Sequence, residues 1–198
     1  MKILLFILIL FSAAGAQDLN TPLRDELLKM LDVDQQRQEC AKGNGDEQIK
    51  CLAEISEKID KPNTKRLEEI FNQYGFPTAK LVGREGVGAF MTILQHAPTD
   101  DLRVKSFKPI KKAFRRKEIT PSEYAGFVDR LRLHQGKPQL YGQGFSFKEG
   151  GGKMTMDAVV DPKNLDKRRK KIGLPPIAES VKILEEMYHL KVEIPKIH

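Results

Sequence analysis

His96 is the residue in this sequence that is best suited to acid–base chemistry. It lies at the predicted C-terminus of a helix, directly before Ala97-Pro98, where the helix dipole favours a protonated imidazole. A histidine that titrates near neutrality can take up or release a proton at physiological pH. The structural alternative is a histidine that only caps the last carbonyl groups of its helix. His96 is therefore a candidate general base.

Asp129 is the candidate partner of that base. It follows Val128 in a helix with a predicted apolar face, so its carboxylate borders the core. From there it could orient His96, as a carboxylate orients the histidine of a catalytic triad. The alternative is an internal ion pair between Asp129 and an arginine, which would be structural.

Tyr141 is the third candidate catalytic residue, and it lies two residues after Gln139 on the same face of a predicted strand. Gly142 and Gly144 would allow a ligand to approach the backbone closely. A strand with these residues would suit the binding of an amide or a sugar. The alternative is a packed hairpin in which the ring of Tyr141 belongs to the core.

A basic run occupies residues 167–171, Lys-Arg-Arg-Lys-Lys. Arg168 or Arg169 could pair with Asp161, with Asp166 or with an anionic ligand. A second basic stretch spans residues 108–117. We do not expect a nucleic-acid partner, because few aromatic residues are interleaved with these cations.

Several enzyme classes lack their motifs in this chain. The sequence has no Gly-x-Ser-x-Gly elbow, no His-Glu-x-x-His pair, no Walker loop and no dinucleotide fingerprint. The four histidines, at positions 96, 134, 189 and 198, do not cluster along the chain. We therefore predict neither a metal site nor a bound cofactor.

Residues 1–16 have the pattern of a secretory signal peptide. Lys2 supplies the positive charge, residues 3–11 form an unbroken apolar run, and Ala14-Gly15-Ala16 offers small residues for cleavage after Ala16. The run has about half of the roughly 20 residues that a membrane span needs. The sequence thus predicts a secreted or periplasmic protein with no stable membrane span after cleavage. Export also argues against a nucleic-acid partner.

Cys40 and Cys51 are the two cysteines of the chain. In an oxidising compartment an even pair favours a disulfide, here across the neck of a predicted helical hairpin. Metal binding is disfavoured because neither cysteine lies in a tight cluster with histidine. A redox role is disfavoured because there is no Cys-x-x-Cys motif.

The elements that position these residues are predicted to be mainly α-helical with a small β-hairpin, an α+β protein. Residues 17–60 are expected to form an N-terminal helical hairpin, followed by a break at residues 61–64. Residues 64–190 are expected to form a single, bundle-like domain. Within it, residues 139–147 and 154–160 alternate toward a period of two, which predicts the β-hairpin.

Several short motifs follow one another along the sequence: residues 74–77 (Tyr-Gly-Phe-Pro), 81–83 (Leu-Val-Gly), 95–97 (Gln-His-Ala), 129–130 (Asp-Arg), 136–142 (Gly-Lys-Pro-Gln-Leu-Tyr-Gly), 161–162 (Asp-Pro), 166–169 (Asp-Lys-Arg-Arg) and 172–174 (Ile-Gly-Leu). The order of these motifs resembles the bacterial family catalogued as domain of unknown function 6624. The family pattern Tyr-Gly-Thr-Gln reads Tyr141-Gly142-Gln143-Gly144 here, so the threonine hydroxyl is absent. The resemblance covers residues 64–174 and implies no established activity. It places the candidate ligand-binding residues in this region: Tyr74, Gln95, Arg130, Gln139, Asp161, Arg168 and Arg169.

Two functions are compatible with these residues. The first is a binding or envelope-associated module that holds a polar or anionic ligand between the candidate residues, which suits the formal net charge of +7. The second is a small hydrolase or transferase in which His96 is the general base and Asp129 or Asp161 orients it. An enzyme of this kind is expected to gather His96, Asp129 and Tyr141 around one pocket.

Overall fold

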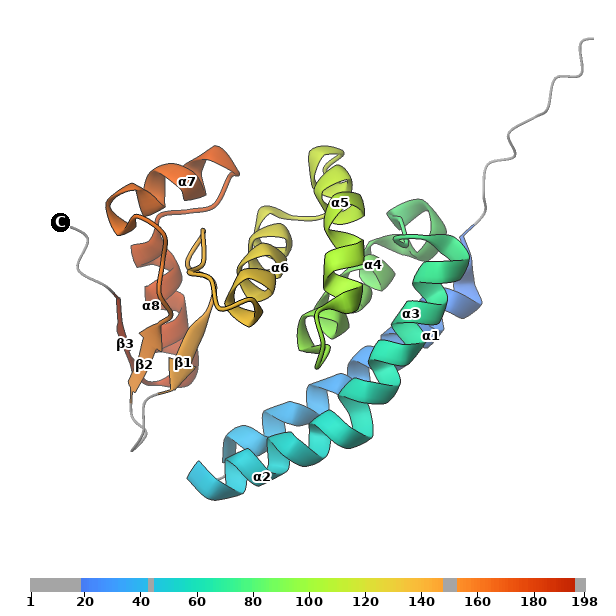
Figure 1. Cartoon of the computed structure of the whole chain (residues 1–198), viewed down its shortest axis with the longest axis horizontal. Coiled ribbons are helices and arrows are strands. Elements are labelled where there is room, and N and C mark those ends of the chain that lie inside the picture. The colour runs from blue at the N-terminus through green and yellow to red at the C-terminus, as the bar shows by residue number, and fades with distance from the viewer. Residues whose placement is uncertain (1–18, 43–44, 148–152, 195–198) are drawn as a thin grey trace, which may run out of the picture.

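The N-terminal part of the chain is a long helical hairpin (Figure 1). The computed structural model describes residues 19–42, 45–147 and 153–194, and the predicted signal peptide lies outside them. The first arm consists of α1 (Thr21–Asp34) and the 3-10 helix η1 (Gln35–Lys42). The second arm consists of α2 (Gly45–Ile55), the π-helical turn η2 (Ser56–Asp60) and α3 (Lys61–Tyr74). The predicted hairpin is therefore present, and its second arm extends beyond residue 60.

The second arm continues through Pro62, so the predicted break at residues 61–64 is wrong. A proline inside a helix lacks the N–H that would bond to the preceding turn. Here the π-helical turn η2 comes directly before it, and the N–H of Lys61 donates to the carbonyl of Ser56. Such a turn widens the helix locally, and α2 and α3 follow one another as a single rod (Figure 1).

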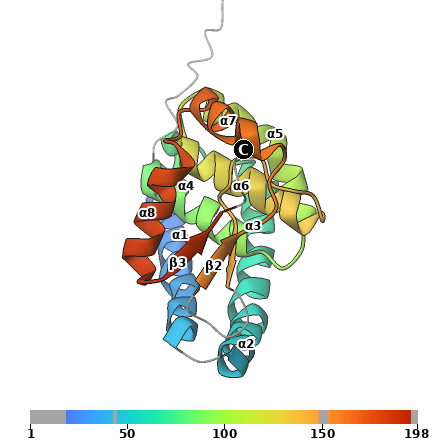
Figure 2. The same ribbon diagram turned by 90° about the vertical axis from the view of Figure 1, so that its left-hand side faces the viewer.

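Helix α4 (Ala79–His96) is central to the main core. Helices α1, α3, α5 (Asp101–Arg115) and α6 (Pro121–His134) all contact it, and Figure 2 shows them gathered around it. Large side chains of all five helices are buried in this core, among them Leu27, Leu67, Phe90, Met91, Leu94, Ile110 and Phe127. The N-terminal hairpin therefore shares one core with the helices that follow it.

Glycines follow the ends of two helices. Helix α3 ends at Gly75, with φ 72°, and α6 is followed by Gly136, with φ 67°. Glycine adopts this left-handed backbone without steric cost. Helix α6 begins with Thr120 and Glu123 forming a reciprocal capping box.

The predicted β-hairpin is confirmed, although its strands are shorter than expected. Strand β1 (Phe145–Phe147) pairs antiparallel with β2 (Lys153–Met156). Residues 139–142 form a bend instead of a strand, with one bridge from Gln139 to Val159. After η3 (Pro162–Asn164), α7 (Leu165–Lys171) and α8 (Ile177–Tyr188), an unpredicted third strand, β3 (Lys191–Glu193), pairs parallel with β2. The protein is thus mainly α-helical with a small sheet.

Among the described residues, no helix combines the length and the apolar character that crossing a bilayer demands.

Candidate functional site

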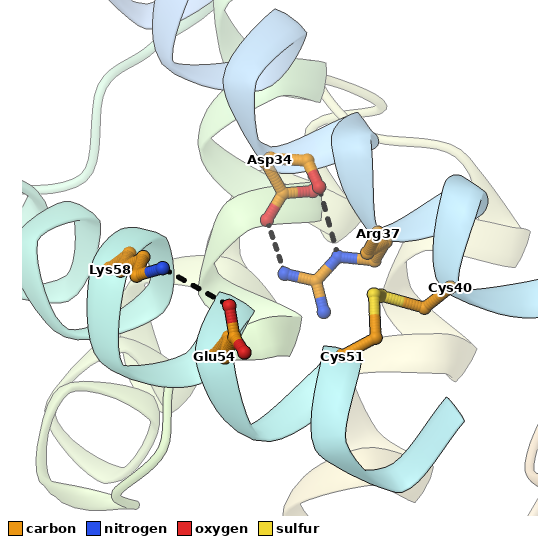
Figure 3. Close-up of a disulfide and its surroundings, with 6 residues drawn as sticks. All are labelled: Asp34, Arg37, Cys40, Cys51, Glu54 and Lys58. Carbon is orange, nitrogen blue, oxygen red and sulfur yellow. Dashed lines mark hydrogen bonds and ion pairs between the residues drawn. A yellow bond between two sulfur atoms is a disulfide. The ribbon is translucent and has the colours of Figure 1, made fainter. Parts of the chain in front are cut away.

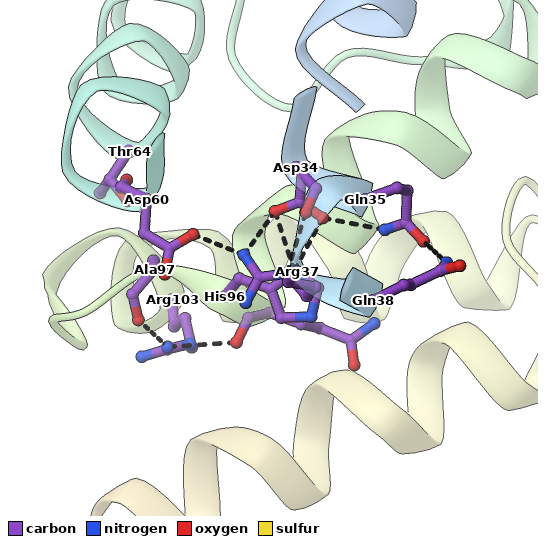
Figure 4. Close-up of polar contacts among 10 residues, drawn as sticks. Asp34, Gln35, Arg37, Gln38, Asp60, Thr64, His96, Ala97 and Arg103 are labelled. Carbon is purple, nitrogen blue, oxygen red and sulfur yellow. Dashed lines mark hydrogen bonds and ion pairs between the residues drawn. The ribbon is translucent and has the colours of Figure 1, made fainter. Parts of the chain in front are cut away.

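The imidazole of His96 is held by Asp34, a residue of the N-terminal hairpin (Figure 4). The Nδ1 atom of His96 lies 2.9 and 3.0 Å from the two carboxylate oxygens of Asp34. His96 ends α4 and Asp34 ends α1, and the packing of these two helices joins the two residues. The side chain of Asp34 is 1% exposed and that of His96 is 23% exposed. A buried carboxylate thus fixes a partly exposed imidazole.

The protonation state of Asp34 determines which nitrogen of His96 is free. Burial raises the pKa of Asp34, but the hydrogen bond and charge of His96 and the charge of Arg37 outweigh it and lower the pKa below its ordinary value. An ionised carboxylate can only accept hydrogen bonds, so Nδ1 carries the hydrogen. The Nε2 atom of His96 has no hydrogen-bond partner in the described part of the chain, which leaves it available to a ligand.

Arg37 connects Asp34 to the second arm of the hairpin. Its Nη2 atom donates to the carboxylates of Asp34 and Asp60 at 2.9 and 2.5 Å, and its Nε atom donates to the carbonyl of Asp34. Asp60 ends the π-helical turn, and the hydroxyl of Thr64 donates to its carbonyl (Figure 4). The turn that accommodates Pro62 therefore also directs a carboxylate at Arg37. The Nη1 atom of Arg37 has no hydrogen bond to any described residue.

A disulfide closes the hairpin just beyond Arg37 (Figure 3). The predicted pairing of Cys40 with Cys51 is confirmed, and their Cα atoms are 5.5 Å apart. Cys40 lies in η1, three residues after Arg37. The cross-link limits the separation of η1 from α2 and so restricts the position of Arg37.

Arg103 holds the end of α4 that carries His96. Its guanidinium is fully buried and donates to the carbonyls of Gln95, Ala97 and Thr99, and to the carboxylate of Asp100 at 2.6 Å. Burial lowers the pKa of Arg103, while Asp100 opposes that shift. The last carbonyls of a helix have no partner within the helix, and here a side chain of α5 supplies one.

Arg130 is a further cation, carried by α6. It is exposed, and no hydrogen bond or ion pair connects it to residues 19–42, 45–147 or 153–194. Although the residue is exposed overall, the partial burial of its guanidinium lowers the pKa of Arg130. The charge of Asp157 raises this pKa, and the charge of Arg37 lowers it. The charge of Arg130 also lowers the pKa of His134, after larger contributions from burial and from Arg103. Arg130 therefore lies within electrostatic range of Arg37 without a partner in direct contact.

Gln95 lies against the same side of α6. A Cβ atom built on Gly126 would lie 3.3 Å from the amide oxygen of Gln95. Residues four apart on a helix share a face, so Arg130 lies one turn along from this contact. Gln95 and His96 end α4, Arg37 lies in η1 and shares Asp34 with His96, and Arg130 lies on α6 one turn from the Gly126 contact of Gln95. We refer to these four residues as the His96 surface.

Asp129 does not orient His96, so that prediction is wrong. Its buried carboxylate accepts hydrogen bonds from the backbone N–H groups of Leu140, Tyr141 and Gln143 at 2.7–3.1 Å. Burial raises the pKa of Asp129, and these N–H groups oppose the shift. The ring of Tyr141 packs against the core, 6.4 Å from the ring of Tyr124. Asp129 therefore anchors the bend that contains Tyr141.

Gln139 is also used inside the protein. It is fully buried, its amide donates to the carbonyls of Gly144 and Asp157, and its amide oxygen accepts from the N–H of Gly144. The two glycines do not open a path for a ligand, because a Cβ on Gly142 would lie 2.9 Å from Met156 and one on Gly144 would lie 2.5 Å from Leu133. Protein side chains already occupy that space.

The two arginines of α7 brace the same bend. Arg169 is fully buried and donates to the carbonyls of Tyr141 and Pro175 and to the hydroxyl of Ser180. Arg168 donates to the carbonyls of Leu140, Val160 and Asp161.

The side chains of the two remaining candidates, Asp161 and Tyr74, do not hold this bend. The carboxylate of Asp161 accepts from the side chain of Asn164 and makes no bond to His96. Tyr74 is exposed at the far end of α3, about 20 Å along that helix from Asp60 at 1.5 Å per residue. Of the candidates named from the sequence, Gln95, His96 and Arg130 are the ones that lie at the end of α4 or on the adjoining part of α6.

Sequence reasoning did not identify Asp34, Arg37, Asp60 or Arg103. One local signal existed for Asp34, because it continues the helical spacing of the buried residues Leu23 and Leu27. A carboxylate on an apolar helix face needs a polar partner. Arg103 carries the same signal, since it lies on the buried face of α5 with Ser106 and Ile110. Within the described residues, no group of three or more histidine, cysteine, aspartate or glutamate side chains is arranged to hold a metal ion.

Comparison with known proteins gives a family and no activity. No curated protein and no solved structure matches the chain. The family of unknown function DUF6624 matches residues 21–193. That match includes the hairpin residues Asp34, Arg37 and Asp60, which lie before residues 64–174, the region covered by the resemblance of the short motifs. The chain therefore belongs to the family of unknown function DUF6624.

Proposed function

We propose that this protein is exported and binds an anionic ligand at the His96 surface. The observation that carries the proposal is Arg130, an exposed guanidinium on α6 with no hydrogen bond or ion pair to the described residues, one helical turn from the contact of Gln95 with Gly126. Guanidinium groups bind carboxylates and phosphates through paired N–H donors. An anion placed between Arg37 and Arg130 would relieve the repulsion between them.

The neighbouring groups support the same ligand chemistry. The Nη1 atom of Arg37 and the Nε2 atom of His96 have no partner in residues 19–42, 45–147 and 153–194. Nε2 becomes a donor when the imidazole is protonated. The side-chain amide of Gln95, the residue before His96, offers two more N–H groups. All of these can donate to one polyoxygen anion.

Export rests on two observations. Residues 1–16 have the composition of a signal peptide, and the Cys40–Cys51 disulfide is of a kind that persists in oxidising compartments. The basic residues of α7 give less support to nucleic-acid binding than their number suggests, because Arg168 and Arg169 donate to backbone carbonyls inside the fold.

Replacing Arg130 is expected to weaken anion binding without harming the fold. Inorganic phosphate is titrated at constant ionic strength, and its binding is followed by NMR. Arg130→Gln is expected to bind phosphate about 10-fold to 100-fold more weakly than wild type, because a charged hydrogen bond worth about 1.5–3 kcal/mol is lost. The melting temperature should be unchanged, because the exposed guanidinium has no partner to lose.

Arg116→Gln is the matched control. It removes the same charge from an exposed arginine at the end of α5, and it should bind phosphate like wild type. Equal phosphate affinity in Arg130→Gln and Arg116→Gln would refute the proposed site.

A second function, acid–base catalysis on the bound anion, is favoured by the His96–Asp34 pair. A buried carboxylate bonded to Nδ1 fixes the tautomer and stabilises the imidazolium that forms when Nε2 takes a proton. In a hydrolase, Nε2 would take this proton from the attacking water and later return it to the leaving group.

Substitution of His96 tests the second function. If the protein hydrolyses nitrophenyl phosphate or nitrophenyl acetate, His96→Gln is expected to lower kcat about 100-fold to 10,000-fold. Arg130→Gln should then raise KM more than it lowers kcat. Turnover that is equal in wild type and His96→Gln would exclude His96 as the base and leave anion binding as the function.

A further inference from the structure

A separate groove lies between α5 and α6, away from the residues of the His96 surface. Its volume is about 620 Å³. Apolar side chains line most of it and basic side chains stand among them: Val104, Lys105, Phe107, Lys108, Val128, Leu131, Arg132, Gln135 and Leu140. Val104 is 54% exposed in this position. We call these residues the α5/α6 groove.

The charged residues of the groove are all of one sign. Lys105, Lys108 and Arg132 line it, and its lining contains no acidic residue within the described part of the chain. Lys105 and Lys108 are three residues apart on α5 and make no ion pair with any described residue. An occupant with an apolar body and a negative end would therefore match both the apolar and the basic side chains of the lining.

The walls of the groove are fixed by contacts outside it. The N–H of Leu140 donates to Asp129 at 2.7 Å, and its carbonyl accepts from Arg168 at 2.9 Å. The ring of Phe107 stacks on Phe127, with ring centroids 6.5 Å apart. A groove with walls held in this way can bind a ligand without first having to be ordered.

We propose that the α5/α6 groove binds a single-chain alkyl carboxylate, with the chain on Val104, Phe107, Leu131 and Leu140. The carboxylate would lie at Lys105 and Lys108. The volume falls in the range of about 300–1,000 Å³ that small-molecule sites occupy. A protein partner would instead need about 800 Å² of surface on each side. The size and the charge of the groove both favour a small amphiphile.

A chain-length series tests the apolar part of the proposal. Octanoate, decanoate and dodecanoate, each kept below its micelle concentration, are titrated into the whole protein by calorimetry. Each added methylene that enters the groove is expected to tighten binding about threefold to fourfold. An affinity that does not change with chain length would overturn the proposal.

Variants of exposed residues test the location and the charge. Val104→Asp places a negative charge on the groove wall and is expected to weaken dodecanoate binding at least 10-fold. Lys105→Gln with Lys108→Gln should weaken it about fivefold to tenfold. Lys111→Gln with Lys171→Gln removes the same net charge elsewhere and should change nothing.

Two further probes test the sign of the ligand charge and the independence of the groove from the His96 surface. Dodecyltrimethylammonium has the same chain with a positive end, and it is expected to bind at least 10-fold more weakly than dodecanoate. Arg130→Gln should bind dodecanoate like wild type, because Arg130 does not line the groove. Equal binding of the two amphiphiles would contradict the proposal. A dimer in sedimentation that dodecanoate does not dissociate would also contradict it, because it would indicate that a second copy of the chain occupies the groove.

Discussion

Replacing Asp129 with alanine is expected to destabilise the folded protein by about 3–5 kcal/mol, because it leaves buried partners of a charged group without a bond. The carboxylate is fully buried and accepts from three backbone N–H groups in the bend at residues 140–143. Those partly buried N–H groups would lose their acceptor. The free energy of unfolding, obtained from urea denaturation followed by circular dichroism, measures the loss.

The control for Asp129 is Asp32→Ala, on the exposed side of α1. It removes an equal charge with no buried partner and should change the unfolding free energy by less than about 0.5 kcal/mol. Where Asp129→Ala is still folded, it should bind phosphate like wild type, since Asp129 makes no bond to His96. A loss of less than about 1 kcal/mol would show that the bend does not depend on this carboxylate.

The bend at residues 139–144 explains why part of the sequence-based prediction failed. Gln139 and Tyr141 lie in a region with few helical signals, and Arg168 and Arg169 lie in a short basic run. In a sequence, both patterns look like parts of a ligand-binding site. In the fold, Gln139 and the two arginines, which lie on the helix α7, bond to backbone groups, and the ring of Tyr141 packs against the core. A backbone that is neither helix nor strand must find partners for its N–H and C=O groups elsewhere. The sequence cannot distinguish a side chain that serves a backbone from one that serves a ligand.

Local patterns were reliable where the interaction itself is local. The capping box of Thr120 and Glu123, the glycine ends of α3 and α6, and the Cys40–Cys51 pair all involve residues close in the chain, and all are present. The partner of His96 is different, since Asp34 lies 62 residues away in another helix. Only the packing of α1 on α4 brings the two together, and no spacing rule could have indicated it.

The helical hairpin therefore has a role that its sequence did not suggest. It supplies Asp34 and Arg37 from one arm and Asp60 from the other. The disulfide and the π-helical turn, which look like structural details by themselves, both act on these residues. The proposed anion site is thus made by the hairpin together with α4 and α6.

Arg103→Met is expected to destabilise the protein by about 3–5 kcal/mol, as the loss of one partner from a buried charged network does. The substitution keeps an apolar chain of similar length but removes all donors to the carbonyls of Gln95, Ala97 and Thr99. It also leaves Asp100 without its main ion-pair partner. Urea denaturation again gives the free energy of unfolding.

The second expected effect of Arg103→Met is at the His96 surface, which Arg103 itself does not line. Because Arg103 holds the end of α4, its loss should let the backbone at Gln95 and His96 move and weaken phosphate binding several-fold in protein that is still folded. Asp100→Ala is the matched control, because it removes the ion pair but keeps the bonds from Arg103 to α4. It should lower stability less and leave phosphate affinity unchanged. If both variants bind phosphate like wild type, the end of α4 is positioned without Arg103, and its guanidinium serves stability alone.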